Sequence, residues 1–119
     1  MYFFDTYAIL EIINGNENYR KFEQLTIITS VLNLGELYYI LLKQFSDDEI
    51  KQRIGRFKLS FLEITPNAVV NAARLRFKNK KKGLSYIDCI SYAIALEKEL
   101  KFLTGDKEFK SMPNVEFVK

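Results

Sequence analysis

Four carboxylates occupy positions from which they could share one divalent cation: Asp5, Glu36, Asp88 and Asp106. Asp5 follows a short aromatic run, Asp106 follows the apolar pair Phe102-Leu103, and Asp88 lies at the start of a helical pattern. Groups at the ends of parallel strands and at nearby helix starts converge on one edge of a doubly wound sheet. Carboxylates gathered within a few ångströms repel one another, so such a cluster normally holds a divalent cation.

Oxygen atoms are the main metal ligands that this chain offers. It has no histidine and one cysteine, Cys89, which excludes Ser-His-Asp and Cys-His catalysis, common zinc sites and internal disulfides. Oxygen ligands favour Mg²⁺ or Mn²⁺. One or two such ions could activate a water and stabilise the leaving oxygen of a phosphodiester.

Each acid also has a purely structural interpretation. Asp5 could cap the helix that follows it, and Glu36 could be an ordinary exposed helix residue. Ser85 and Asp88 have the spacing of a capping box, and Asp106 could form a turn. Four such coincidences at converging positions are harder to accept than one shared site.

Strand-like and helical patterns alternate along the chain, which favours a parallel sheet covered by helices on both faces. The prediction is a three-layer α/β/α fold, a single domain spanning residues 1–119. About five strands are expected, at residues 2–4, 26–29, 61–64, 101–104 and 115–118. Helices are expected from Thr6, over 19–25, after the caps Ser30 and Ser46, from Pro66 after Thr65, and after Ser85.

The helix that carries Glu36 has a predicted core face. A glycine inside a helix lowers helix stability by roughly 1 kcal/mol relative to alanine. The presence of Gly35 therefore suggests that another backbone packs closely beside Glu36. The apolar stripe is expected to consist of Val31, Leu34, Tyr38, Leu41 and Phe45, with Glu36 off it.

The charge distribution suits a polyanionic partner. The chain carries 18 Lys and Arg against 15 Asp and Glu, a net charge of +3, and a site holding four acids would leave the remaining surface more basic. Lys80, Lys81 and Lys82 could contact phosphates of such a partner or simply end a helix. The tyrosines Tyr38, Tyr39, Tyr86 and Tyr92 could stack on bases, although core packing or a subunit contact is the commoner use.

Composition points to an intracellular protein. At 48% hydrophobic and 28% charged residues, the 119-residue chain can bury one core. No leader pattern and no apolar run of membrane-spanning length appears, and a single cysteine suits a reducing compartment. A cytoplasmic location without membrane attachment is therefore expected, with Cys89 as a small buried side chain.

Four segments together resemble the PIN-domain family of metal-dependent ribonucleases, especially the VapC-type toxins of prokaryotic toxin-antitoxin pairs. They are FFDTYAI, VLNLGELYYIL, LSYIDCISYAIA and FLTGDKEF, and the resemblance covers essentially the whole chain. Asp5, Glu36, Asp88 and Asp106 match the family's acids, and Thr6 and Thr104 match its usual hydroxyl neighbours.

The resemblance implies endonucleolytic cleavage of RNA with Mg²⁺ or Mn²⁺, a homodimer, and a small antitoxin protein that blocks the site. An RNA-processing nuclease without an antitoxin would keep the same acids. A non-catalytic RNA-binding or protein-interaction module would keep the acids only for structure. A phosphatase with a nucleophilic Asp-x-Asp pair is disfavoured, because position 7 is Tyr.

Overall fold

Five parallel strands form the centre of the molecule. The computed structural model describes residues 1–119, and its strands pair in the order β3-β2-β1-β4-β5, with every pairing parallel. This confirms the predicted five-stranded parallel sheet. The strands are β1 (Tyr2–Phe4), β2 (Ile27–Thr29), β3 (Leu59–Phe61), β4 (Lys101–Thr104) and β5 (Val115–Phe117).

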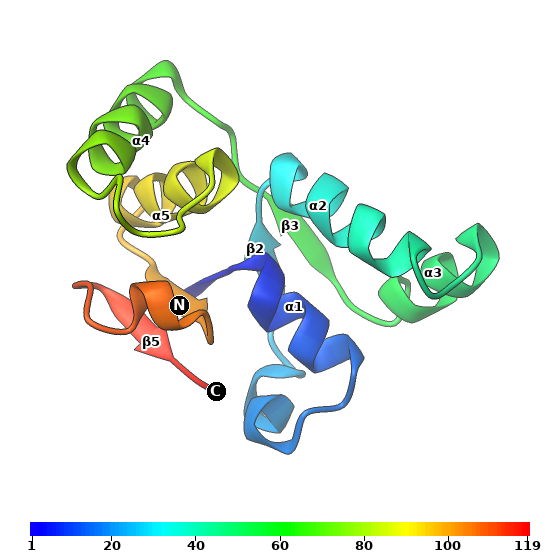
Figure 1. Cartoon of the computed structure of the whole chain (residues 1–119). Coiled ribbons are helices and arrows are strands. Elements are labelled where there is room, and N and C mark those ends of the chain that lie inside the picture. The colour runs from blue at the N-terminus through cyan, green and yellow to red at the C-terminus, as the bar shows by residue number, and fades with distance from the viewer.

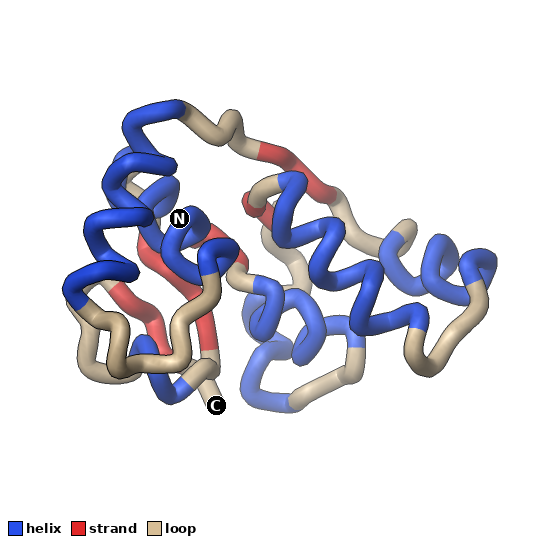
Figure 2. Tube along the Cα trace, turned by 45° about the horizontal axis from the view of Figure 1, so that its top comes forward, coloured by secondary structure: helices blue, strands red, loops and turns tan.

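Helices cover both faces of the sheet, as the three-layer prediction requires (Figures 1 and 2). One core cluster joins Phe3 and Phe102 to α4 and α5, and a second joins Phe4 and Leu103 to α1, α2 and α3. Neighbouring residues of one strand thus serve opposite layers. The helices are α1 (Thr6–Ile13), η1 (Glu17–Phe22), α2 (Val31–Leu42), α3 (Asp47–Ile54), α4 (Pro66–Lys78), α5 (Tyr86–Glu97) and η2 (Lys107–Phe109).

The strand order reverses beside β1. From β1 the chain moves outward to β2 and β3, then crosses over to β4 and β5 on the other side of β1. In Figure 1, the start of α1 lies between α2 on one side and α5 on the other. Ligands of open parallel sheets bind at such a reversal, outside the carboxyl ends of the strands.

Helix starts follow their predicted caps. The side chains of Ser30, Ser46 and Ser85 accept hydrogen bonds from backbone amides in the first turns of α2, α3 and α5. Helix α4 begins at Pro66 as predicted, and the Thr65 side chain caps it as well. The helical segment expected at 19–25 is instead the 3₁₀ helix η1, which begins earlier because Asn16 caps it. No helix has the combined length and hydrophobicity that crossing a membrane requires.

Strand β3 lies earlier than the predicted 61–64. It is an edge strand that pairs only with β2, and β2 ends at Thr29 opposite Phe61. The Leu62 amide donates the last hydrogen bond, 2.9 Å long, to the Thr29 carbonyl. Leu62 and Ile64 are apolar because they pack against the α4–α5 core cluster and not because they belong to the ladder.

The predicted core face of α2 is partly wrong. Leu41 is buried, and Tyr38 and Phe45 pack against the core as predicted, but Asn33 and Leu37 are also buried, whereas Val31 is 56% exposed. Gly35 is exposed, and no atom lies within 4 Å of the position that a Cβ would take, so the suggested close backbone packing is absent. Space is open beside Glu36.

Gly105, which follows β4, is the glycine with the least room for a side chain. An added Cβ would lie 2.4 Å from the Val118 carbonyl oxygen and 2.3 Å from the Tyr7 ring. We expect Gly105→Ala to lower the free energy of unfolding by about 1–3 kcal/mol, as overpacking does. Gly35→Ala, at an open helical position, should raise it by up to about 1 kcal/mol. Urea unfolding measures both, and equal effects would contradict the packing assigned to Gly105.

Candidate active site

Asp5 lies at the carboxyl end of β1, where the strand order reverses. Its backbone amide donates to the Leu103 carbonyl of β4 over 3.0 Å, and its carboxylate accepts a 2.8 Å hydrogen bond from Thr104 Oγ1. Asp5 occupies the N-cap position of α1, yet its side chain makes no capping hydrogen bond. The capping interpretation of Asp5 is therefore wrong, and its carboxylate is held by β4 instead.

Burial and neighbouring acids raise the pKa of Asp5. The side chain is 3% exposed. Loss of solvation is the main reason that its pKa rises from 3.8 to about 7, against the opposing effect of the Thr104 hydrogen bond, while the charges of Asp88 and Glu36 raise it further. Two acids that are far from Asp5 in the sequence thus act on it through space.

Asp88 connects the remaining acids. It is half-buried, and burial is the main cause of its raised pKa, opposed by hydrogen bonds from Ser85. The negative charges of Glu36 and Asp106 also raise the pKa of Asp88. The structure therefore brings Asp5, Glu36, Asp88 and Asp106 into one set of interacting charges at the carboxyl edge of the sheet.

Asp88 and Asp106 also have the structural roles that the sequence suggested, a capping box and a turn. The Asp88 carboxylate accepts a 2.8 Å hydrogen bond from the Ser85 amide, which completes the predicted capping box. The Asp106 carboxylate accepts a 3.0 Å bond from the Glu108 amide at the start of η2. Thr104 accepts a 3.1 Å bond from the Asp106 amide while donating to Asp5, so it links both acids.

A buried hydrogen-bond network is centred on Asn33. Three of its residues lie only one to three residues away from an acid in the sequence. Asn33 Nδ2 donates to Thr6 Oγ1 over 3.1 Å, and its Oδ1 accepts from Ser91 Oγ over 3.0 Å and from Ser30 Oγ over 2.6 Å. All four side chains are buried, and no buried side-chain polar atom in the chain lacks a partner. Asn33 therefore joins α1, α2 and α5 at one point.

The network is in register with the acids. Thr6 directly follows Asp5, Asn33 precedes Glu36 by three residues, and Ser91 follows Asp88 by three. Residues three apart on a helix are neighbours on its surface, so each bond lies about one turn from a carboxylate. Sequence reasoning missed Asn33. The available signal was its position four residues before Leu37 and eight before Leu41, which places it on the buried stripe of α2.

The acids lack cationic partners but are not arranged as a finished metal site. The one ion pair in the chain joins Arg20 to Glu17, far along the chain from these acids. No group of three or more Asp, Glu, Cys or His side chains is placed to hold a metal ion. A reason is visible: Asp5, Asp88 and Asp106 each turn toward a local hydrogen-bond donor. One buried and three half-buried carboxylates without cationic partners fit a hard divalent cation chemically once these side chains turn toward it.

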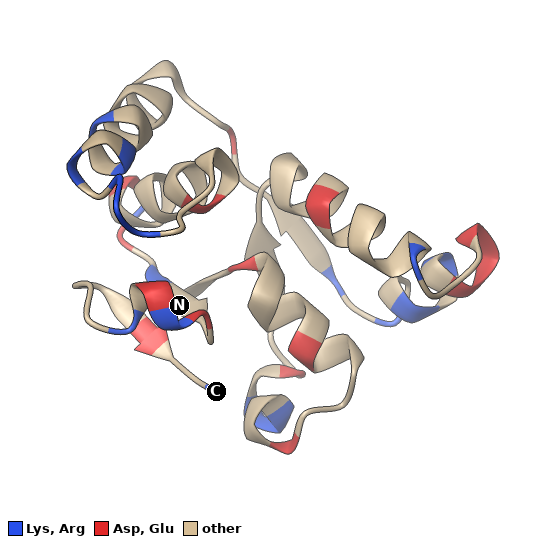
Figure 3. Ribbon diagram, in the orientation of Figure 1, with Lys and Arg blue, Asp and Glu red and all other residues tan.

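The basic run lies beside the turn that carries Asp106. Lys80 and Lys81 are exposed, and Lys82 Nζ donates a 3.1 Å hydrogen bond to the Glu108 carbonyl. Figure 3 shows basic residues along the second half of α4 and the loop after it, next to α5. None of these lysines forms an ion pair with an acid.

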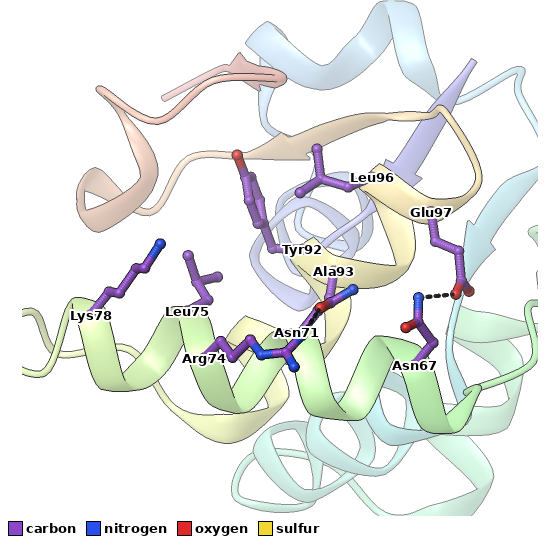
Figure 4. Close-up of a pocket in the computed structure, with 9 residues that line it drawn as sticks. All are labelled: Asn67, Asn71, Arg74, Leu75, Lys78, Tyr92, Ala93, Leu96 and Glu97. Carbon is purple, nitrogen blue, oxygen red and sulfur yellow. Dashed lines mark hydrogen bonds between the residues drawn. The ribbon is translucent and has the colours of Figure 1, made fainter.

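A separate cavity of about 440 Å³ lies between α4 and α5, with Leu75 and Tyr92 in its apolar lining (Figure 4). Its polar groups bond among themselves: Arg74 donates to Asn71 over 3.1 Å, and Asn67 donates to Glu97 over 3.4 Å. None of the four acids lines it. This cavity is therefore not the carboxylate site.

The fold and the acidic edge define a class: a doubly wound α/β domain with carboxylates gathered where the strand order reverses. The family model described as the PIN domain matches residues 2–115, so this chain belongs to the PIN-domain family. No curated protein sequence matches it.

Solved structures share the fold over nearly the whole chain. VapBC2 from Rickettsia felis, bound to a promoter DNA fragment, has 22% identity and a TM-score of 0.78 over 99% of this chain and 98% of its own. VapC20 from Mycobacterium tuberculosis, described as a sarcin-ricin loop cleaving toxin, has 17% identity and a TM-score of 0.77 over all of both chains. DNA-bound VapBC from Salmonella typhimurium has 22% identity and a TM-score of 0.71, covering 98% and 95%.

The raised pKa of Asp5 predicts how stability depends on pH. Between its ordinary pKa of 3.8 and about 7, the unfolded chain releases this proton while the folded chain retains it, so stability falls as pH rises through that window. Asp5→Asn removes this penalty. In chelator, its stability relative to the unmodified protein should rise by up to about 4 kcal/mol between pH 4 and pH 7, then level off. A difference that does not change with pH in urea unfolding would contradict the assignment.

Asn33→Ala tests the buried network. It leaves the hydroxyls of Ser91 and Thr6 without their partner, and an unsatisfied buried polar group costs about 1–3 kcal/mol. Asn71→Ala makes the same change at an exposed position of α4 and should be neutral or slightly stabilising. Thermal and urea unfolding would compare them, and an Asn33→Ala protein as stable as the control would show that the network does not support the fold.

Proposed function

We propose that this PIN-domain protein is a metal-dependent endoribonuclease that acts as the toxin of a toxin-antitoxin pair. The observation that carries the proposal is the buried Asp5 carboxylate, which feels the charges of Asp88 and Glu36 and has no cationic partner. Keeping like charges together is unfavourable unless something binds them. Membership of the PIN-domain family supports the same conclusion.

In this proposal Asp5, Glu36, Asp88 and Asp106 hold Mg²⁺ or Mn²⁺ directly or through water. When bound, the ion supplies an activated water and stabilises charge on the leaving oxygen of the phosphodiester. Thr104 orients the Asp5 carboxylate through its 2.8 Å hydrogen bond, and Thr6 is fixed beside Asp5 by Asn33. Asp88 would exchange its bond to the Ser85 amide for the ion.

The ionisation of Asp5 sets the direction of the pH dependence. A carboxyl with a pKa of about 7 is partly protonated in neutral, metal-free solution, and only its deprotonated form binds a cation well. Metal binding would therefore release a proton from Asp5. Affinity for the ion should increase as pH rises from 6 to 8.

RNA is the proposed substrate, with Lys80, Lys81 and Lys82 near its phosphates. The bond from Lys82 to the Glu108 carbonyl places this basic loop beside the turn of Asp106. The net charge of +3, despite the acidic cluster, supports attraction of a polyanion. Activity on RNA suits the cytoplasm.

The proposed protein partners are an antitoxin and a second copy of the chain. Several structures of the same fold are complexes by their description, including a toxin-antitoxin complex from Klebsiella pneumoniae. Exposed apolar side chains offer contact area: Val31 and Leu42 on α2, and Val69 and Val70 on α4. A nuclease that processes RNA without an antitoxin would use the same acids.

One observation favours the alternative of a non-catalytic module: Asp88 and Asp106 already serve as helix caps, and no preformed metal group exists. Capping alone does not explain Asp5, whose side chain caps nothing. Metal binding and cleavage distinguish the two proposals.

Removal of single carboxylates tests the enzyme. We expect Asp5→Asn and Asp88→Asn to reduce Mn²⁺-dependent cleavage of RNA by about 100- to 1,000-fold, because several kcal/mol of transition-state stabilisation depend on the ion. Asp48→Asn, an exposed acid in the first turn of α3, is the matched control and should cleave normally. Cleavage assays with and without chelator measure the effect.

Mn²⁺ should also raise the melting temperature of the unmodified protein and of Asp48→Asn, but much less that of Asp5→Asn. This readout does not depend on knowing the natural RNA. Undiminished cleavage by Asp5→Asn, or the absence of both Mn²⁺ binding and cleavage in the unmodified protein, would refute the proposal in favour of a module.

A further inference from the structure

Two exposed aromatic rings and two basic side chains border a second cleft, outside the carboxylate site. The cleft encloses about 400 Å³ between the end of α4 and the start of α5, within the usual size range of small-ligand pockets. Phe77 is 70% exposed and Tyr86 is 54% exposed. Ala73, Arg76 and Lys80 complete the lining.

The two basic groups are held against the two rings. The Arg76 guanidinium lies 4.5 Å from the centre of the Tyr86 ring, and Arg76 Nε donates a 3.2 Å hydrogen bond to the Leu84 carbonyl. Lys80 Nζ lies 4.4 Å from the centre of the Phe77 ring. Neither basic group forms an ion pair, so both charges remain available to an anion.

Phe77 and Tyr86 share their exposure with Tyr39, whereas several other aromatic residues of the chain are buried. Tyr92 and Phe109 pack against Phe102 inside the core. Because Phe77 is exposed, it forgoes most of the stabilisation that burial of a side chain of its size provides. A paired aromatic and basic surface is what single-stranded nucleic acids bind, through base stacking and phosphate contacts.

We propose that this cleft is a subsite for one unpaired nucleobase of an RNA strand, stacked on Phe77 and Tyr86, with the adjoining phosphates held by Arg76 and Lys80. The proposal rests on RNA being the substrate. It adds a second contact region to the carboxylate site, formed by side chains from the α4 end and the α5 start.

The subsite is next to the acids along α5. Tyr86 and Asp88 belong to the same first turn, separated by about 3 Å along the helix axis and pointing to different sides of it. A strand crossing the start of α5 would therefore meet the cleft within a nucleotide or two of the carboxylates.

A protein segment is the less suitable occupant. A docked helix or strand requires a continuous apolar groove or an open sheet edge. The cleft lies between two helices, and Ala73 is the only aliphatic residue in its lining. Its aromatic and basic composition favours a flat, π-rich group attached to phosphate.

Binding of a fluorescent single-stranded oligoribonucleotide in chelator tests the subsite, because no cleavage is needed. Loss of one stacking contact is worth about 1–3 kcal/mol, so Phe77→Ala and Tyr86→Ala should each weaken binding by roughly 5- to 150-fold. Tyr39→Ala is the matched control, since Tyr39 is 66% exposed on α2 with Lys43 Nζ 5.0 Å from its ring centre. This control should bind normally.

Abasic substitution identifies the base. Removing one base at a time from the oligonucleotide should weaken binding at one position in the unmodified protein, and this position should lose its effect in Phe77→Ala. Lys80→Ala should instead reduce the dependence of binding on salt. Melting temperatures of Phe77→Ala and Tyr86→Ala should match the unmodified protein, since both rings are exposed.

Unchanged RNA binding in both aromatic variants, or an equal loss of RNA binding in Tyr39→Ala, would overturn the subsite. It would also be overturned if both aromatic variants lost binding of a protein partner but still bound RNA normally. The two proposals fail separately. A protein that binds RNA through Phe77 and Tyr86 but never cleaves it would refute the nuclease and retain the subsite.

Discussion

Hydrogen bonds to one buried amide hold together helices whose carboxylates repel one another. Asn33 bonds to Thr6 of α1 and Ser91 of α5, and each of these three residues lies within one turn of an acid. In a buried setting such bonds are strong, and leaving any of them unmade is costly. Neutral, buried groups thus fix the distances between the helices that carry the carboxylates, so the acids themselves need not attract one another.

The parallel sheet makes this arrangement possible. Strand β1 lies between β2 and β4, so residues at its carboxyl end meet residues that follow both neighbours. Asp5 is tied to β4 through the Leu103 carbonyl and Thr104, and Thr29 at the end of β2 donates a 2.8 Å bond to the Phe4 carbonyl. The rigid backbone beneath Asp5 explains how a carboxylate that is 3% exposed stays in place despite its desolvation.

The sequence predicted the features that local rules govern. Strand-helix alternation identified the parallel sheet, serine caps identified the starts of α2 and α5, and Pro66 identified the start of α4, because these signals act over a few residues. The placement of Asp5 and Asp106 after strands followed from the same alternation. Long-range features were harder: β3 is bounded by the length of its partner β2, which Leu62 and Ile64 do not reveal.

The network around Asn33 was missed for a related reason. An asparagine near a helix start is usually assigned to capping or to the surface, so the sequence predicts a core face of α2 that includes Val31 and Leu34 but not Asn33. The burial of Asn33 depends on hydrogen-bond partners in α1 and α5, and the residue pattern of α2 alone cannot predict them. The exposure of Phe77 and Tyr86 likewise follows from the ends of two packed helices and not from their own pattern.

The capping box of α5 has a consequence for how tightly an ion could be held. One Asp88 oxygen accepts from the Ser85 amide, so an ion that took this oxygen would break one of the two bonds of the capping box, while the bond from the Asp88 amide to Ser85 Oγ would remain. Ion affinity is then reduced by the free energy of that one hydrogen bond, about 1 kcal/mol, and loosening of this turn would track ion occupancy. The order of the first turn of α5 would thereby indicate whether an ion is bound.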